Sequence, residues 1–251
     1  MDTSVEPQSV NEFWKIAEYE QMQAEYTVQD KVQFLKTATL EQLKDIFIQY
    51  RYFTKYYGSD LGLLIYKVPY GNFKSLISEI AAEELGNGKA SQSHIQLWDN
   101  FLISLGVEEH ALESSIHPGN AMLLEELREL LHSASPAFAI GLRGMGGECL
   151  CQIYLTAVFE NFKQNPVVQA LQDSIDWSFW NIHAGDADIE HRLLVKAAIS
   201  EIVENDPGSV SELSRGYLKA KGIWDHFWKN AYDEGYAAAG SRVSGARKVV
   251  N

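Results

Sequence analysis

The sequence predicts an all-α protein built as a single helical bundle. Apolar residues return at spacings of three and four almost everywhere, and no segment shows the period of two that marks a strand. The 251 residues are 46% hydrophobic and contain no Pro-rich or Gly/Ser-rich linker, so the chain can bury one large core. We expect one domain over residues 1–240, with about seven core helices, and a flexible tail over residues 241–251.

Capping residues and hydrophobic periodicity delimit the expected helices. Thr39 and Gln42 form the pattern of a capping box, which predicts the start of a long helix that ends near Lys67. Ser135 followed by Pro136 predicts another start, because Ser caps a helix and Pro suits its first position. The other expected helices cover residues 10–20, 28–36, 73–85, 91–106, 118–131, 138–162, 166–203 with at most one break, and 210–238.

The charge balance argues against polyanionic partners. The chain carries 34 acidic and 21 basic side chains, a formal net charge of −13, and its Lys and Arg are scattered. Neither nucleic acid nor an anionic membrane surface is therefore an expected partner. No apolar run reaches the roughly 20 residues of a membrane helix, and residues 1–10 lack the pattern of a signal peptide. These features predict a soluble, cytoplasmic protein.

The two cysteines, Cys149 and Cys151, lie two positions apart in an apolar segment. A helix would direct them to different faces, which makes a disulfide geometrically unfavourable. Two thiols alone also make a weak zinc site. We expect small, buried core residues in a reducing compartment.

The densest group of ionisable residues is HAGDADIEH, His183–His191, inside an otherwise apolar stretch. On a continuous helix, at about 100° per residue, His183, Asp186 and Glu190 share one face, with His191 at its edge. Asp188 and His191 neighbour each other at a spacing of three. Mixed histidine and carboxylate ligands suit iron or manganese. The alternative is a solvated helix face with incidental charges.

Two further segments supply carboxylates. Glu84 is separated from His94 by ten positions that include the sequence GNG. On a continuous helix these two residues would lie about 15 Å apart along the axis, too far to share an ion, whereas an unwound or bulged segment could bring them together. Glu148 follows three glycines within four residues in an apolar segment. It lies either on an exposed face or in the interior with a partner such as a metal, because a lone buried carboxylate is costly.

The order of these motifs resembles the haem-oxygenase-like diiron oxidases and oxygenases. The resemblance is carried by ELGNGKASQSH with the following LWDNFLISLGV, Glu84–Val107, and by FWNIHAGDADIEHR, Phe179–Arg192, and it extends over roughly residues 73–198. It implies a haem-oxygenase-like helical bundle. Carboxylates and histidines that face inward from several helices are the usual way in which a bundle builds a two-metal site.

The resemblance also implies a ligand set. Carried over position by position, the expected metal ligands are Glu84, His94, Glu148, His183, Asp188 and His191. The family pattern is His-x-x-x-Asp-x-x-His, whereas four residues separate the first His from the Asp in this chain. A bulge could restore the geometry. Otherwise Asp186 or Glu190 replaces one of the expected ligands.

A function follows from the resemblance. It implies a non-haem diiron oxidase or oxygenase that uses two iron ions, Fe(II)/Fe(III), and dioxygen, with manganese as an alternative metal. The reaction would be N-oxygenation, desaturation or carbon–carbon cleavage of a small organic substrate, an amino acid or a carboxylic acid. An external electron donor is a further expected partner. Trp177 and Trp180 would shape an apolar substrate pocket, and Arg143 or Arg192 would meet an anionic group.

Two other functions stay open. One is a metal-free enzyme on the same fold, like thiaminase II or the quinone-cofactor synthases, in which carboxylates, Tyr and Cys act as acid, base or nucleophile. The other is a non-catalytic helical interaction module. Aromatic residues on the expected last helix, Trp224, Phe227 and Trp228, would serve a partner, a homodimer or the core.

Overall fold

The computed structural model describes residues 6–7, 9–113, 116–183 and 186–245, without the side chains of residues 26–31, 186–192 and 234–245. All the regular structure in these ranges is helical, so the all-α prediction is confirmed. The α-helices are α1 (Val10–Val32), α2 (Leu40–Lys67), α3 (Asn72–Glu84), α4 (His94–Ser104), α5 (Pro118–Ser133), α6 (Pro136–Ala139), α7 (Gly146–Phe162), α8 (Pro166–Leu171), α9 (Ser178–His183), α10 (Asp186–Asn205) and α11 (Val210–Gly245). Short 3-10 turns join several of them.

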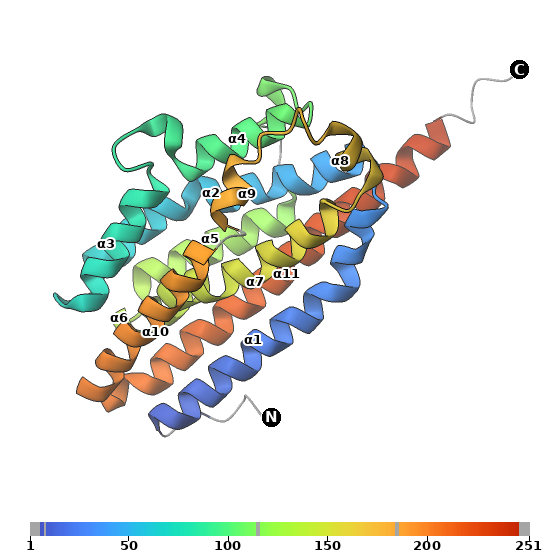
Figure 1. Ribbon diagram of the computed structural model, residues 1–251. Coiled ribbons are helices and arrows are strands. Elements are labelled where there is room, and N and C mark those ends of the chain that lie inside the picture. Colours follow the sequence, from blue (N-terminus) through green and yellow to red (C-terminus); the bar gives the residue numbers. More distant parts are fainter. Residues whose placement is uncertain (1–5, 8, 114–115, 184–185, 246–251) are drawn as a thin grey trace, which may run out of the picture.

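The long helices lie side by side and the shorter ones cover one side of them. In Figure 1, α1, α2, α7 and α11 run along the length of the molecule. Helix α11 contacts α1, α2, α5, α6 and α7. On the other side of α2 and α7 lie α3, α4, α9 and α10, which also contact one another. The predicted ligands therefore come from two groups of helices that pack together.

The predicted helix starts are confirmed in detail. Thr39 accepts a hydrogen bond from the backbone N–H of Gln42, and the Gln42 side chain accepts one from the N–H of Thr39 at 2.9 Å. Helix α2 then continues without a break to Lys67. Ser135 accepts a hydrogen bond from the N–H of Phe138, and Pro136 is the first residue of α6. Both capping side chains, Thr39 and Ser135, accept hydrogen bonds from backbone N–H groups that a helix start leaves without partners.

Two expected helix boundaries are wrong, and a third region agrees with its expected break. Residues 28–36 do not form a separate helix, because α1 continues to Val32 and a 3-10 turn follows. The stretch 166–203 is broken between α8 and α9, which agrees with the one expected break. Residues 184–185, between α9 and α10, lie outside the described residues, so the expected continuous helix from His183 to Glu190 stays a prediction. Finally, α11 continues to Gly245, seven residues past its expected end.

A π-helical segment, Ile140–Met145, joins α6 to α7 where hydrophobic periodicity predicted one regular helix. Here α11 approaches closely enough to exclude side chains. A Cβ at Gly141 would lie 2.1 Å from the carbonyl oxygen of Leu213, and one at Gly216 would lie 2.1 Å from that of Phe138. Both contacts are shorter than any real Cβ makes, so this crossing requires glycine on both helices.

Aromatic side chains dominate the core. Trp98, Trp180, Phe101 and Phe162 are fully buried and pack in edge-to-face or tilted pairs. The last-helix residues Trp224, Phe227 and Trp228 are also buried, so this aromatic stripe belongs to the core. The homodimer stays a prediction, and its interface would have to lie on a surface other than this buried stripe. In the described part of the chain, no helix is both long and apolar enough to cross a membrane.

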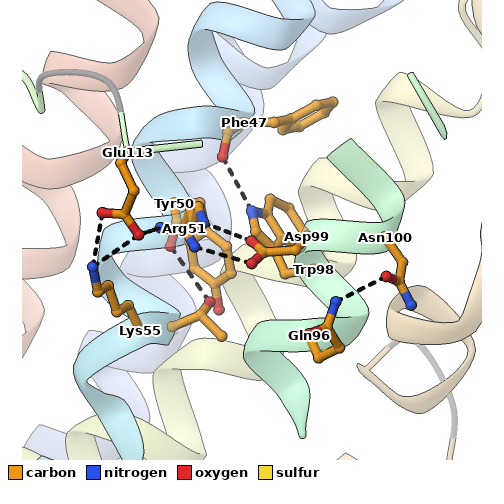
Figure 2. Close-up of polar contacts among 10 residues, drawn as sticks. Phe47, Tyr50, Arg51, Lys55, Gln96, Trp98, Asp99, Asn100 and Glu113 are labelled. Atoms are coloured by element: carbon orange, nitrogen blue, oxygen red, sulfur yellow. Dashed lines mark hydrogen bonds and ion pairs between the residues drawn. The ribbon is translucent and has the colours of Figure 1, made fainter. Parts of the chain in front are cut away.

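An ion pair fixes α4 against α2. Arg51 Nε donates to Asp99 Oδ1 at 2.5 Å and Arg51 Nη2 donates to Asp99 Oδ2 at 2.9 Å, while Glu113 bridges Arg51 and Lys55 (Figure 2). The indole N–H of Trp98 donates to the backbone carbonyl of Phe47 on α2 at 3.3 Å. These contacts position the first residue of α4, His94.

Candidate functional site

A tight turn brings Glu84 and His94 together. Glu84 ends α3, and Gly86, Asn87 and Gly88 follow with φ values of 81°, 50° and 84°, the left-handed region that glycine adopts readily. At Gly86 a Cβ would lie 2.3 Å from the carbonyl oxygen of Lys89, so the turn is closely packed. The chain reverses and α4 begins at His94. Glu84 Oε2 then lies 2.9 Å from His94 Nδ1, and each side chain is 11% exposed.

His183 joins this pair from a third helix. It is the last residue of α9 and is buried. Its imidazole centroid lies 4.7 Å from that of His94, with the rings at 84°, and 4.2 Å from the ring of Phe179. Three of the predicted ligands, from α3, α4 and α9, are therefore neighbours.

Glu148 is held by a tyrosine that the sequence did not single out. Glu148 lies in the first turn of α7 and accepts a hydrogen bond from the hydroxyl of Tyr57 on α2. Burial, then the nearby carboxylates of Glu148 and Glu84, raise the pKa of Tyr57 well above its usual range, with Arg143 opposing them. The hydroxyl therefore keeps its proton and donates a hydrogen bond to Glu148. Space for it comes from Gly147, where a Cβ would meet the Tyr57 oxygen.

A buried ion pair supports Tyr57 from behind. The guanidinium of Arg143 lies 4.2 Å from the centre of the Tyr57 ring, and its Nη2 lies 2.8 Å from Asp60 Oδ2. Both charged side chains are at most 2% exposed. Burial raises the pKa of Asp60, while Arg143 and Arg128 lower it. Arg143, expected to meet an anionic substrate, is thus already paired with a carboxylate.

A small cavity lies among these groups, and we call it the inner cavity. Its volume is about 20 Å³, enough for about one water molecule. Its lining residues are Tyr50, Phe53, Thr54, Tyr57, Glu84, Gly147, Cys151, Phe179, His183 and Trp224. The Tyr50 hydroxyl lies 3.6 Å from Cys151 Sγ, and burial followed by this contact raises the pKa of Tyr50. A single ion or water molecule fits this space, whereas an organic substrate does not.

Several predicted ligands cannot be placed. The side chains of Asp186, Asp188, Glu190 and His191 lie outside the described residues, as does that of Arg192. Helix α10, which carries them, begins three positions after His183. Among the side chains that are described, no three His, Cys, Asp or Glu residues are arranged to hold one ion. The roles of the α10 residues stay predictions.

The described donors nevertheless match the spacing of metal ligands. Two ligand atoms bound to one ion at about 2.1 Å and at a right angle lie about 3.0 Å apart. The 2.9 Å between Glu84 Oε2 and His94 Nδ1 fits that value. Carboxylate and imidazole together suit iron and manganese. The residues present thus fit part of a metal site, to which Glu148, His183 and α10 would add.

The two tryptophans expected in a substrate pocket, Trp177 and Trp180, pack against other aromatic side chains. Trp180 is fully buried between Trp98 and Phe162, and Trp177 stacks on Phe162 with ring centroids 5.8 Å apart. Neither tryptophan lines the inner cavity, although Phe179, which lies between them in the sequence, does. Cys149 and Cys151 form no disulfide, as expected. Cys149 is buried, whereas Cys151 lines the cavity.

Comparison with solved structures identifies the fold. A CADD-like protein of unknown function from Nostoc punctiforme is 19% identical, with a TM-score of 0.72 over 89% of this chain and 98% of that chain. A TenA homologue from Pseudomonas syringae pv. tomato is 14% identical, with a TM-score of 0.69 over 92% and 95%. A domain of unknown function with a heme oxygenase-like fold from Shewanella denitrificans is 16% identical, with a TM-score of 0.68 over 95% and 96%.

No family model and no curated protein matches the sequence. At identities below 20%, the structural likeness concerns the fold and not the activity. It confirms one implication of the sequence resemblance. The chain has an all-α, haem-oxygenase-like fold.

Proposed function

We propose that this protein is a non-haem diiron oxidase or oxygenase that uses dioxygen to oxidise a small organic substrate. The observation that carries the proposal is the proximity of Glu84, His94 and His183, from three helices, next to a small cavity that Glu84 and His183 line. Glu148 lies next to the cavity wall through its bond to Tyr57. Carboxylates and histidines facing one another in a helical bundle are typical of dinuclear iron sites.

In this proposal Glu84, His94, Glu148 and His183 hold the ions together with Asp188 and His191. Asp186 and Glu190 are the alternates on α10. Reduced iron would supply the electrons that activate dioxygen, and manganese is the alternative metal. An external donor would return the irons to the reduced state.

The remaining residues of the site prepare it for this chemistry. Tyr57 donates a hydrogen bond to Glu148, which orients this carboxylate. Phe53, Phe179 and Trp224 line the inner cavity with aromatic surface and keep bulk water away. Tyr50 keeps its proton because burial raises its pKa.

The test is dioxygen consumption by protein loaded anaerobically with Fe(II). We expect faster consumption than by the same Fe(II) in buffer, and a loss of this excess in His183→Ala. The matched control is His110→Ala. The side chain of His110 is 81% exposed and pairs with Glu108, which is not a predicted ligand. Equal consumption by the wild-type protein and His183→Ala would contradict the proposal.

One observation favours a second function, a metal-free enzyme of the thiaminase-II type. Cys151 and Tyr50 are 3.6 Å apart in the inner cavity, beside Glu84, and a thiol next to a hydroxyl could act as nucleophile and acid. The TenA homologue of Pseudomonas syringae shares the fold. Activity that survives exhaustive chelation and disappears in Cys151→Ser would favour this function over the diiron one.

A further inference from the structure

A cysteine and a tyrosine from different helices meet at the inner cavity. Cys151 Sγ on α7 lies 3.6 Å from the hydroxyl oxygen of Tyr50 on α2, and 101 positions separate the two residues in the sequence. Both side chains line the inner cavity together with Glu84 and His183, which are predicted metal ligands. The pair therefore lies where the proposed function places its oxidant.

The packing around Tyr50 holds its ring in one position. The residue is 4% exposed, and its ring stacks on that of Trp228 with centroids 5.5 Å apart and planes at 10°. The Trp98 ring packs edge-on against it at 4.8 Å, and the parallel ring of Phe53 lies 6.1 Å away. In an interior packed this closely, the ring cannot turn away without displacing its neighbours. The contact with Cys151 is therefore a lasting one.

The thiol lies close to a reactive part of this ring. When a phenol loses an electron and its proton, the unpaired electron is shared between the oxygen and the carbons ortho and para to it. Each ortho carbon is two bonds away from the hydroxyl oxygen that Cys151 Sγ contacts. A shift of Sγ along the ring edge carries it from this oxygen to the nearer ortho carbon. The inner cavity gives room for the shift, because both side chains line it.

We propose that dioxygen at this site oxidises the pair and joins Cys151 Sγ to an ortho carbon of Tyr50 through a thioether bond. The S–H bond of Cys151 and one C–H bond of Tyr50 break, and an S–C bond forms. The two electrons and two protons that are released reduce dioxygen to hydrogen peroxide, and the Tyr50 hydroxyl stays in place. The inference rests on the proposed function for its oxidant, which is dioxygen activated by iron beside the inner cavity.

The link would also decide between the two candidate functions. A linked Cys151 has no S–H group and cannot act as a nucleophile. The metal-free function needs that nucleophile, whereas the diiron function does not. A protein that carries the link is therefore excluded from the metal-free function.

Cys149 provides a comparison within the same helix. It lies two positions before Cys151 on α7, so its side chain points about 200° away around the helix axis. It is 2% exposed and is not among the described residues that line the inner cavity. Of the two cysteines, we expect only Cys151 to react.

The experiment compares protein kept anaerobic with protein that is loaded anaerobically with Fe(II) and then exposed to dioxygen without a substrate. Both samples are reduced with dithiothreitol, digested with trypsin and analysed by mass spectrometry. Trypsin releases peptides 45–51 and 144–163, which carry Tyr50 and the two cysteines, respectively. We expect the exposed sample to contain these peptides joined and lighter by two hydrogen atoms than their sum. The thiols that can be titrated in denaturant should fall from two to about one per chain.

Three variants test which atoms form the link. Cys151→Ser and Tyr50→Phe should both abolish the joined peptides, and Tyr50→Phe keeps the packed ring. Cys149→Ser is the matched control and should form the link to within about twofold of the wild type. Loss of the link in Cys149→Ser, or a wild-type Cys151 that gains oxygen atoms instead of joining Tyr50, would overturn the proposal.

The iron content and dioxygen consumption of the same samples separate this inference from the proposed function. Protein that binds iron and consumes dioxygen but forms no link would overturn the inference and leave the proposed function standing. A link that forms in dioxygen without bound iron would support the joining of Tyr50 to Cys151 and contradict the diiron function. Protein that binds no iron, consumes no dioxygen and forms no link would contradict both.

Discussion

Replacing Tyr57 by Phe tests whether the buried tyrosine positions a metal ligand. The change removes only the hydroxyl that donates to Glu148 and keeps the ring that packs against Arg143 at 4.2 Å. A hydrogen bond to a charged group contributes about 1.5–3 kcal/mol. At about 1.4 kcal/mol per tenfold, its loss corresponds to about 10- to 150-fold in affinity. Loss of an outer-shell partner of a metal ligand typically costs about 10- to 100-fold, so the two estimates agree.

The assay is a titration of the metal-free protein with Co(II), followed through the visible absorption of the bound ion. We expect Tyr57→Phe to weaken one of the two binding steps by about 10- to 100-fold. Tyr56→Phe is the control, because Tyr56 is the preceding residue of α2 and its ring packs on Arg128, 3.6 Å away. The positioning role is refuted if Tyr57→Phe binds Co(II) within about twofold of the wild type, or if Tyr56→Phe weakens binding equally.

Three further substitutions test the turn, the helix crossing and the buried ion pair. Gly86→Ala should weaken Co(II) binding much more than Gly88→Ala in the same titration. Both glycines have φ above 80°, but only a Cβ at Gly86 would clash with backbone atoms. Equal losses of Co(II) affinity in the two variants would contradict this expectation. Gly216→Val should lower the free energy of unfolding by about 1–3 kcal/mol or more in urea denaturation. Gly222→Ala, with open space around its Cβ inside α11, should instead raise it by about 0.5–1 kcal/mol, because Ala favours a helix interior over Gly. Arg143→Met should cost about 3–5 kcal/mol by the same measurement, because it leaves the buried Asp60 only the more distant Arg128, 3.8 Å away. A loss below about 1 kcal/mol would show that Arg128 alone compensates the carboxylate.

Features that depend on neighbours in the sequence could be predicted. The capping box at Thr39 and the Ser135–Pro136 start are local patterns, and both helices begin where these residues place them. The two glycines after Glu84 indicated an interruption. Their sequence could not give the 2.9 Å between Glu84 and His94, because that distance depends on three successive left-handed residues and on the packing of Gly86.

Features that depend on contacts between distant helices could not be predicted. Tyr57 bonds Glu148, 91 positions away, and only the fold shows that Gly147 makes room for it. The π-helical segment at Ile140–Met145 leaves no mark in apolar periodicity, since both of its flanks are regular helix.

The most direct test of the central claim is anomalous X-ray diffraction at the iron edge, from crystals grown anaerobically with Fe(II). The account predicts two iron peaks per chain beside the inner cavity, within bonding distance of Glu84, His94, Glu148 and His183, and with ligands from α10. Crystals grown with Fe(II) that show no anomalous peak at these side chains, and in which Glu84 Oε2 still lies 2.9 Å from His94 Nδ1, would contradict it.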